Sequence, residues 1–179
     1  RFGGTVAIDD AFKMGFDHLV IAVGAGLPKA LNIPGSLAPG VMSANSFLMS
    51  LHLNGGISDN SITDLQIELP AIVIGGGLTG VDTATEVQAY YIQQVERIYD
   101  QYAVLAKGTN VEDIFAYVGD DAKLKLFLQH GKEVKDLRHR AKAAGSIPDF
   151  SKLVQGWGGV KIVYRKRMQD SPAYKNNYY

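Results

Sequence analysis

The stretch LPAIVIGGGLTGVDTATE, residues 69–86, decides the fold of this chain. Residues 71–74 are an apolar run rich in β-branched side chains, which indicates a short buried strand. Three glycines follow at the spacing Gly-x-Gly-x-x-Gly, at Gly75, Gly77 and Gly80. The residues after Gly80 are typical of the first turns of a helix. The order of strand, glycine turn and helix predicts an α/β fold.

Each glycine of this turn has its own steric task in a dinucleotide-binding site. Gly75 lets the chain turn sharply, Gly77 lets a pyrophosphate approach the backbone, and Gly80 lets the helix pack close to the strand. The N–H groups from Leu78 through Thr79 to Gly80 lie at the positive end of the helix dipole, where phosphate is favoured. A glycine-rich connection in another α/β fold is the alternative. No Gly-Lys-Ser/Thr follows, which excludes a P-loop.

The composition sets the broad class of the protein. The 179 residues are enough for one or two small domains, and 46% hydrophobic with 20% charged residues indicates a globular chain. The formal net charge of +0 favours neither nucleic acid nor an anionic membrane as a partner. The sequence contains no run of about 18 or more apolar residues, so no membrane span is predicted. The absence of cysteine excludes a disulfide and a thiolate nucleophile, and a cytoplasmic location fits without being required.

A second candidate strand lies near the N-terminus. Residues 19–23 are continuously apolar, which predicts a buried strand of the parallel type. Gly24 and Gly26 follow it and would let the backbone leave the sheet closely, as beside a ligand. Four other elements are expected in this part of the chain: a short strand within residues 1–8, one helical turn over 9–15, a helix over 46–53, and an irregular linker over 57–69.

Apolar residues spaced by three and four from Val87 to Leu105 predict one long helix from about 78 to 106, with this face buried. Further helices are expected over the following residues. Their signals are a Thr109-x-x-Glu112 capping box, a start at Asp120 or Asp121 with a stop at Gly131, a helix over 132–144, and a short helix beginning at 148–150. Basic residues at 132, 135, 138, 140 and 142 alternate with acidic ones, which favours a solvated helix face over a partner-binding patch.

Residues 160–164, with apolar side chains at the alternate positions 160, 162 and 164, predict the second strand of the same domain. In a Rossmann half, the end of this strand meets the adenosine ribose, where an acidic residue accepts from the 2′-hydroxyl. This chain instead has Arg165, Lys166 and Arg167, which favours a 2′-phosphate and hence NADPH over NADH. One such contact contributes about 1.5–3 kcal/mol. An ordinary basic strand end is the alternative.

Three segments resemble the FAD-dependent pyridine nucleotide-disulfide oxidoreductase family: Asp17–Gly26, Ile33–Gly35 and the Gly75–Gly80 turn. In that family a strand ending Ala-Thr-Gly-Ala links the FAD domain to an inserted NAD(P)H domain, and Val23 stands here in place of the Thr. The chain is most similar to the branch typified by the small subunit of NADPH-dependent glutamate synthase. The features behind that branch are the continuation of the turn to Asp82 and the strand end Tyr-Arg-Lys.

The resemblance implies NADP and FAD as cofactors, with hydride passing from NADPH to flavin. Asp82 stands where many relatives have a Glu near the nicotinamide. No nucleophile–base set is present and the four histidines lack ligand spacing, so neither a catalytic residue nor a metal ligand is predicted. The cofactor-binding residues expected are Gly24, Ala25, Gly75, Gly77, Leu78, Thr79, Gly80, Asp82, Arg165 and Lys166.

These expectations combine into a domain plan. Residues 70–89 and 160–179 form a partial Rossmann-like NAD(P)-binding unit, residues 90–159 a helical insertion, and residues 1–69 a remnant of the FAD domain with a linker. The family's FAD fingerprint is absent, so the chain is expected to be an internal fragment of a larger flavoenzyme. Two strands leave sheet edges unpaired, which predicts either self-association through those edges or an intact parent.

Two functions are compatible with the sequence. The first is the NADPH-binding segment of an FAD-dependent NADPH oxidoreductase, inactive as a fragment alone. The second is a non-catalytic nucleotide-binding or interaction module whose helical insertion docks a partner. The expected partners are a nicotinamide nucleotide and a second copy of the chain, with no nucleic acid and no membrane.

Overall fold

A computed structural model describes residues 3–22, 31–58, 60–63 and 65–178, with the backbone alone for 176–178. The chain divides into two compact units, Arg1–Pro34 and Gly35–Tyr179, and each is described by itself.

The first unit contains one helix, α1 (Ile8–Lys13), in its described residues, and this helix ends before Gly15 as the sequence predicts. The two strands predicted here are not found in the described residues. Over residues 3–8 the chain forms a turn, an isolated β-bridge residue at Val6 and the start of α1, and residues 19–22 form no strand, with Val20 87% exposed. A parallel strand is stable only when it pairs with neighbours, and the described residues of this unit offer no strand to pair with.

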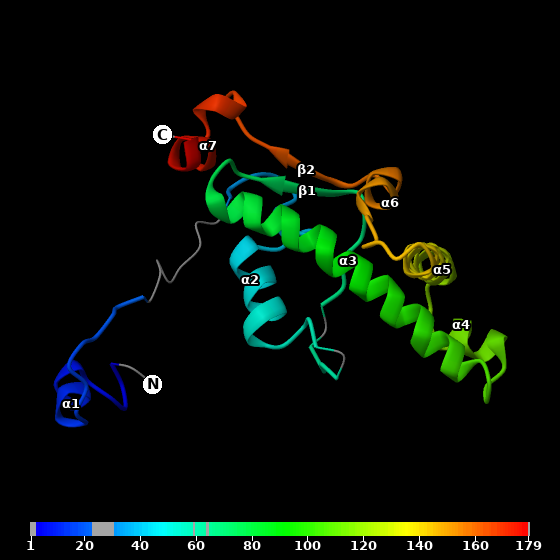
Figure 1. Ribbon diagram of the computed structural model, residues 1–179, viewed down its shortest axis with the longest axis horizontal. Coiled ribbons are helices and arrows are strands. Elements are labelled where there is room, and N and C mark those ends of the chain that lie inside the picture. The colour runs from blue at the N-terminus through cyan, green and yellow to red at the C-terminus, as the bar shows by residue number, and fades with distance from the viewer. Residues whose placement is uncertain (1–2, 23–30, 59, 64, 179) are drawn as a thin grey trace. The chain divides into compact units, whose positions relative to one another are not determined.

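The second unit is built around α3 (Leu78–Leu105), as Figure 1 shows. This helix confirms the prediction of one long helix over about 78–106. The strands β1 (Ala71–Ile74) and β2 (Val160–Val163) lie on one side of it, and α2 (Ala44–Leu48) lies on the other. The remaining elements are a π-helix (Met49–Leu53), α4 (Val111–Val118), α5 (Asp121–Ala143), α6 (Ser151–Gly156), a 3₁₀-helix (Met168–Asp170) and α7 (Pro172–Tyr178).

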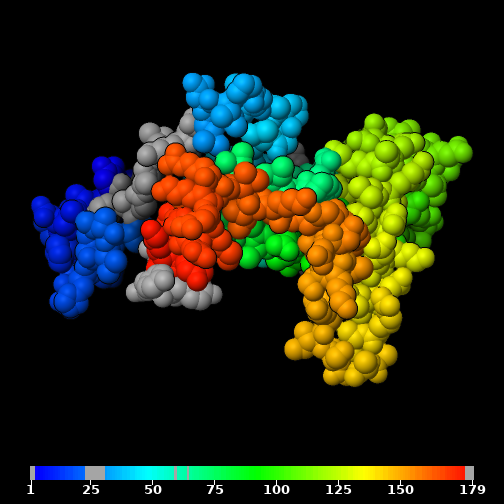
Figure 2. Space-filling model, turned by 90° about the horizontal axis from the view of Figure 1, so that it is seen from above, coloured from blue at the N-terminus to red at the C-terminus, as the bar shows by residue number. Residues whose placement is uncertain are grey.

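The two strands pair in parallel, with Ala71 opposite Val160 and Ile74 opposite Val163. The α3–α6 segment joins them, as a parallel pair requires a long crossover. Helices with a small parallel sheet fit the predicted α/β fold. In the space-filling view β2 runs across the surface between α6 and α7 (Figure 2).

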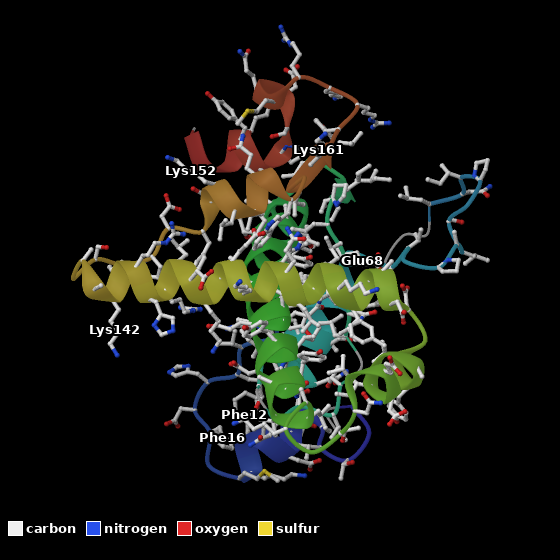
Figure 3. The ribbon with its side chains drawn as sticks, turned by 90° about the vertical axis from the view of Figure 1, so that its right-hand side faces the viewer. Phe12, Phe16, Glu68, Lys142, Lys152 and Lys161 are labelled. Carbon is white, nitrogen blue, oxygen red and sulfur yellow. The ribbon has the colours of Figure 1, made fainter. Side chains whose placement is uncertain are left out.

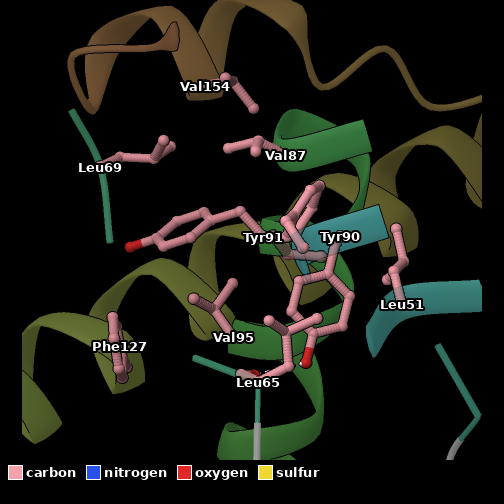
Figure 4. Packing of buried hydrophobic residues seen from close by; sticks show 11 residues of the cluster. Leu51, Leu65, Leu69, Val87, Tyr90, Tyr91, Val95, Phe127 and Val154 are labelled. Carbon is pink, nitrogen blue, oxygen red and sulfur yellow. Dashed lines mark hydrogen bonds between the residues drawn. The ribbon is translucent and has the colours of Figure 1, made fainter. Parts of the chain in front are cut away.

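The core lies around the middle of α3. Tyr91 and Val95 of α3 are fully buried, and Leu51 of the π-helix and Phe127 of α5 join the same cluster (Figure 4). Burial of such side chains is the main favourable term in folding. The stripe of apolar residues along α3 is therefore core packing from Val87 to Val95, as its spacing predicts, whereas its last member, Leu105, is 52% exposed.

The segment before β1 is irregular, as predicted, but α3 holds it in place. The Gln94 side chain accepts from the Ile67 N–H and donates to the Ile67 carbonyl, both at 2.8 Å. The Tyr90 hydroxyl donates to the Leu65 carbonyl at 2.7 Å. These bonds satisfy backbone groups that no helix or strand pairs, so the segment orders without secondary structure.

The structure corrects two helix boundaries. Asn110, not Thr109, caps α4, because its side chain accepts from the Glu112 N–H at 3.3 Å. The predicted capping box is therefore wrong. The predicted stop at Gly131 is also wrong, since α5 runs through it from Asp121 to Ala143. A side chain at 131 would collide with the α3 backbone at Val95, so this glycine serves helix packing rather than helix termination.

The basic side chains of α5 divide between contact and solvent. Lys135 pairs with Asp100 of α3 at 2.6 Å, and Arg138 pairs with Glu96 of α3 at 2.9 Å. Lys142 is exposed near the end of the helix (Figure 3). Part of the predicted solvated face therefore belongs to the α3–α5 interface. No helix in the described ranges is long and apolar enough to cross a membrane.

Candidate functional site

The glycine turn lies between β1 and α3, where the strand ends. Gly75 has a φ of +140°, a conformation that L-amino acids with side chains rarely adopt. A Cβ on Gly80 would lie 2.6 Å from the Gly75 carbonyl oxygen. The first turn of α3 therefore approaches the strand end as closely as the spacing predicts for these two glycines.

Gly77 is the N-cap residue of α3 and faces open space. No atom lies within 4 Å of the position that a Cβ on Gly77 would take. Its carbonyl accepts the Gly80 and Val81 N–H groups at 3.0 and 3.2 Å, and it supplies no side-chain cap. The N–H groups of Leu78 and Thr79 precede this first pair of bonds, at the positive end of a 28-residue helix. This surface is suited to a phosphate.

Gly76, at a variable position of the motif, was not predicted to matter. A Cβ on Gly76 would lie 2.6 Å from two carbons of the Tyr164 ring, and the Gly76 carbonyl accepts the Ala173 N–H at 3.2 Å. The only signal in the sequence was a glycine where the motif accepts any residue. The structure thus links the turn to the segment that follows β2.

Arg165 and Lys166 follow β2 at the edge where β1 also ends. The pairing of Ile74 with Val163 brings the carboxyl ends of both strands together. Both cations are exposed, and neither has an ion-pair partner among the residues that the structure describes. Arg167, by contrast, pairs with Asp170 at 2.9 Å. Ligands of open parallel sheets bind beyond this edge, so the two unpaired cations lie on the expected side.

The structure says less about the three other predicted cofactor-binding residues, Asp82, Gly24 and Ala25. Asp82 is exposed on α3, one turn past the helix start, and its carbonyl accepts the Thr85 hydroxyl at 2.9 Å. Gly24 and Ala25 lie outside the described residues, so their predicted role stays a prediction.

A buried polar cluster lies away from this edge, where α3 meets α5 and the end of α6. The Tyr91 hydroxyl and Nδ1 of His130 lie 2.8 Å apart, and the His130 ring stacks on Trp157 at 4.2 Å. The Trp157 indole donates to Glu133 at 2.9 Å. Burial lowers the pKa of His130 and raises the pKa of Tyr91. Both groups are therefore neutral near pH 7, which suits a structural role.

The described residues offer no site for a metal ion. Within the described ranges, no three His, Asp or Glu side chains converge in a way that could hold an ion.

Comparison with known proteins places these features in a class. The pyridine nucleotide-disulphide oxidoreductase family matches residues 2–144. An uncharacterized protein, RP006, of Rickettsia prowazekii (strain Madrid E) is 36% identical over 176 residues, which cover 98% of this chain and 23% of that protein. The external alternative NAD(P)H-ubiquinone oxidoreductase B1, mitochondrial, of Arabidopsis thaliana is 30% identical over 114 residues, 56% of this chain and 19% of the relative. No solved structure matches.

The family match and the Arabidopsis relative point to an oxidoreductase class, and the matched family generally uses flavin and pyridine nucleotides. The chain belongs to the pyridine nucleotide-disulphide oxidoreductase family, whose match covers most of its length. The chain spans 23% and 19% of the lengths of the two curated relatives.

Proposed function

We propose that this chain is the NADPH-binding segment of an FAD-dependent oxidoreductase in which hydride passes from NADPH to flavin. The observation that carries the proposal is the open glycine turn at the start of α3, next to two unpaired cations at the same sheet edge. The name of the Arabidopsis relative, an NAD(P)H-ubiquinone oxidoreductase, supports a nicotinamide nucleotide as the ligand class.

The residues of the turn are assigned to the pyrophosphate. Gly77 leaves room for it, and the N–H groups of Leu78 and Thr79 donate to its oxygens. Gly75 shapes the turn through its φ of +140°, and Gly80 lets the first turn of α3 pack against the Gly75 carbonyl. The described residues therefore fit a dinucleotide at this place.

Arg165 and Lys166 are assigned to the 2′-phosphate of NADP. Each is exposed, and no carboxylate in the described part of the chain neutralises it. A charge-assisted bond to a phosphate is worth about 1.5–3 kcal/mol. We assign Asp82 to the nicotinamide end of the same ligand, as the resemblance of the glycine turn to the family implies.

The finer domain plan follows from the same assignment. Residues 70–89 and 160–179 form a partial Rossmann-like unit, residues 90–159 an insertion, and residues 1–69 the FAD-side part, with Gly24 and Ala25 near FAD. FAD supplies the hydride acceptor when bound. Four further points remain predictions. They are similarity to the glutamate synthase small-subunit branch, origin as an internal fragment, self-association through sheet edges, and a cytoplasmic location.

The test is nucleotide affinity, measured by calorimetry for NADP⁺ and NAD⁺ on the wild-type chain and on Arg165→Ala/Lys166→Ala. The wild type is expected to prefer NADP⁺, and the double variant to lose about tenfold to a hundredfold of that preference. Arg140→Ala/Lys142→Ala removes two exposed cations of α5 and is the matched control. An unchanged preference in the first variant would refute the 2′-phosphate assignment.

A non-catalytic docking module is the second candidate, favoured by the distal end of the helical insertion. Val104 and Leu105 end α3 with 69% and 52% exposed surface, and Tyr117 of α4 is 93% exposed. Exposed apolar side chains of this kind mark interaction surfaces when they are contiguous. An absorbance measurement on the longest natural protein that contains this chain distinguishes the two candidate functions. Loss of flavin absorbance on addition of NADPH supports the enzyme, and absence of flavin supports the module.

A further inference from the structure

We propose that Tyr164 is a positioning residue. It holds Arg165 and Lys166, the two cations assigned to the 2′-phosphate, in a fixed position relative to the pyrophosphate-binding turn. The inference rests on the proposed function and adds to it a residue that sets the preference for NADP over NAD. It starts from a contact that the motif does not predict.

The Tyr164 ring occupies the place of a missing side chain. A Cβ on Gly76 would lie 2.6 Å from Cδ2 and Cγ of the ring and 2.9 Å from Cδ1. Real Cβ atoms do not come so close to a neighbour, so this packing exists only because residue 76 is glycine. The ring is half-buried at this contact.

The contact links the two halves of the proposed site. Gly76 lies between the strand end and Gly77, while Tyr164 directly precedes Arg165. The neighbouring ladder bond, from the Gly75 N–H to the Val163 carbonyl at 3.0 Å, fixes the backbones next to it. The described structure shows no ladder bond between the two strands beyond this one, and the Tyr164 ring meets Gly76 at the residue before the cations.

The carbonyl side of Gly76 is held as well. It accepts the Ala173 N–H at 3.2 Å, from the start of α7. The loop that carries Arg165 and Lys166 is thus attached to one glycine at both of its ends, through Tyr164 before it and Ala173 after it. Two such attachments restrict the positions that the cations can take relative to the turn.

The ring carries this task, and the hydroxyl does not. Among the described residues, the Tyr164 hydroxyl has no hydrogen-bond partner. Phenylalanine at this position should therefore preserve the contact, whereas alanine should remove it. The turn itself is held by the separate contact of Gly80 with the Gly75 carbonyl, so it should survive the loss of the ring.

The experiment measures NADP⁺ and NAD⁺ affinities for wild type, Tyr164→Phe, Tyr164→Ala and, as the control, Ile147→Ala at a 92% exposed position between α5 and α6. Tyr164→Ala is expected to weaken NADP⁺ binding about tenfold and NAD⁺ binding less than about threefold. Tyr164→Phe and Ile147→Ala are expected to match the wild type. A merely structural role would weaken both nucleotides equally and would overturn the proposal, as would a loss of preference in Tyr164→Phe.

A second variant keeps the test decisive if Tyr164→Ala does not fold. Gly76→Ala leaves the tyrosine in place but displaces its ring, so it should lower the same preference. Combining Tyr164→Ala, or Gly76→Ala, with Arg165→Ala/Lys166→Ala should give no further loss, because the cations being positioned are gone. Additive losses would overturn the proposal.

Failure of the proposed function can be distinguished from failure of the role given to Tyr164. A wild-type chain that binds neither nucleotide rejects the proposed function, and the inference with it. A wild-type chain that prefers NADP⁺, together with a folded Tyr164→Ala variant that keeps this preference, rejects only the role of Tyr164.

Discussion

Gly131 of α5 packs directly against the backbone carbonyl of Val95 of α3, with no side chain between the two helices. A Cβ at 131 would also lie 2.6 Å from the Cβ of Tyr99. This close approach places the neighbouring His130 beside Tyr91, where their side chains lie 2.8 Å apart. The helix crossing and the buried cluster therefore depend on one glycine.

Gly131→Ala should destabilise the fold even though alanine favours helices. The intrinsic gain is about 1 kcal/mol, but the added methyl meets backbone that cannot move aside locally. Overpacking of this kind costs about 1–3 kcal/mol. The free energy of unfolding, measured in urea, is therefore expected to fall. Gly156→Ala in α6, where a Cβ meets open space, should leave it unchanged or raise it. Equal behaviour of the two variants would contradict this packing.

Gly77→Ala should weaken nucleotide binding without loss of stability, whereas Gly80→Ala should lower stability. The Gly77 position is open and has a φ of −89°, so alanine there fits the protein but occupies the space assigned to pyrophosphate. We expect near wild-type stability and at least about tenfold weaker nucleotide binding. Gly80→Ala would clash with the Gly75 carbonyl and lower the thermal midpoint. Thermal unfolding and calorimetry on the same samples check both expectations, and a Gly77→Ala variant that binds normally would reject the pyrophosphate assignment.

Gln94→Met should lower stability by about 1–3 kcal/mol, because it leaves both backbone groups of Ile67 without their partner. Gln94 is buried and methionine has a similar volume, so the loss is that of hydrogen bonds rather than of packing. Gln93→Met, on the exposed face of the same helix, is the control. Urea unfolding of the two variants gives the comparison. A loss no greater than that of the control would mean that the segment before β1 is held by other contacts.

Acid should destabilise the chain through His130. Burial lowers its pKa in the folded state below the ordinary value of 6.5, so the unfolded chain binds the proton more readily. The contribution of His130 is therefore complete above about pH 6.5 and is lost as pH falls from there toward the folded-state pKa. The charged group facing it is Glu133 on α5, which opposes the shift, and Tyr91 faces it from α3.

Urea unfolding between about pH 7.5 and about pH 5.5 measures this dependence. His130→Gln should flatten it, and His139→Gln, at an exposed position of α5, should not. If both variants retain the wild-type slope, other groups cause the acid sensitivity.

Local sequence patterns predicted the elements whose contacts are themselves local. The periodicity of α3 and the glycine spacing after β1 sufficed, because one helix face and one turn determine them. The strand expected at residues 19–23 is not found over 19–22, the part that the structure describes, since a strand depends on partners that its own sequence does not encode. The helix stop at Gly131 failed for a related reason: glycine signals either a helix end or a close neighbour, and only the fold brings Val95 to it. The Tyr164–Gly76 contact joins residues far apart in sequence, and its one local signal was a glycine at a position where the motif accepts any residue.

The most direct test of the central claim is a titration of the isotope-labelled chain with NADP⁺, followed by the backbone amide signals in two-dimensional NMR. The account predicts that the signals of Gly77, Leu78 and Thr79 shift first and most, together with those of Arg165 and Lys166, while those of α5 stay in place. Shifts confined to other parts of the chain, or no shifts at all, would contradict a nucleotide site at this turn.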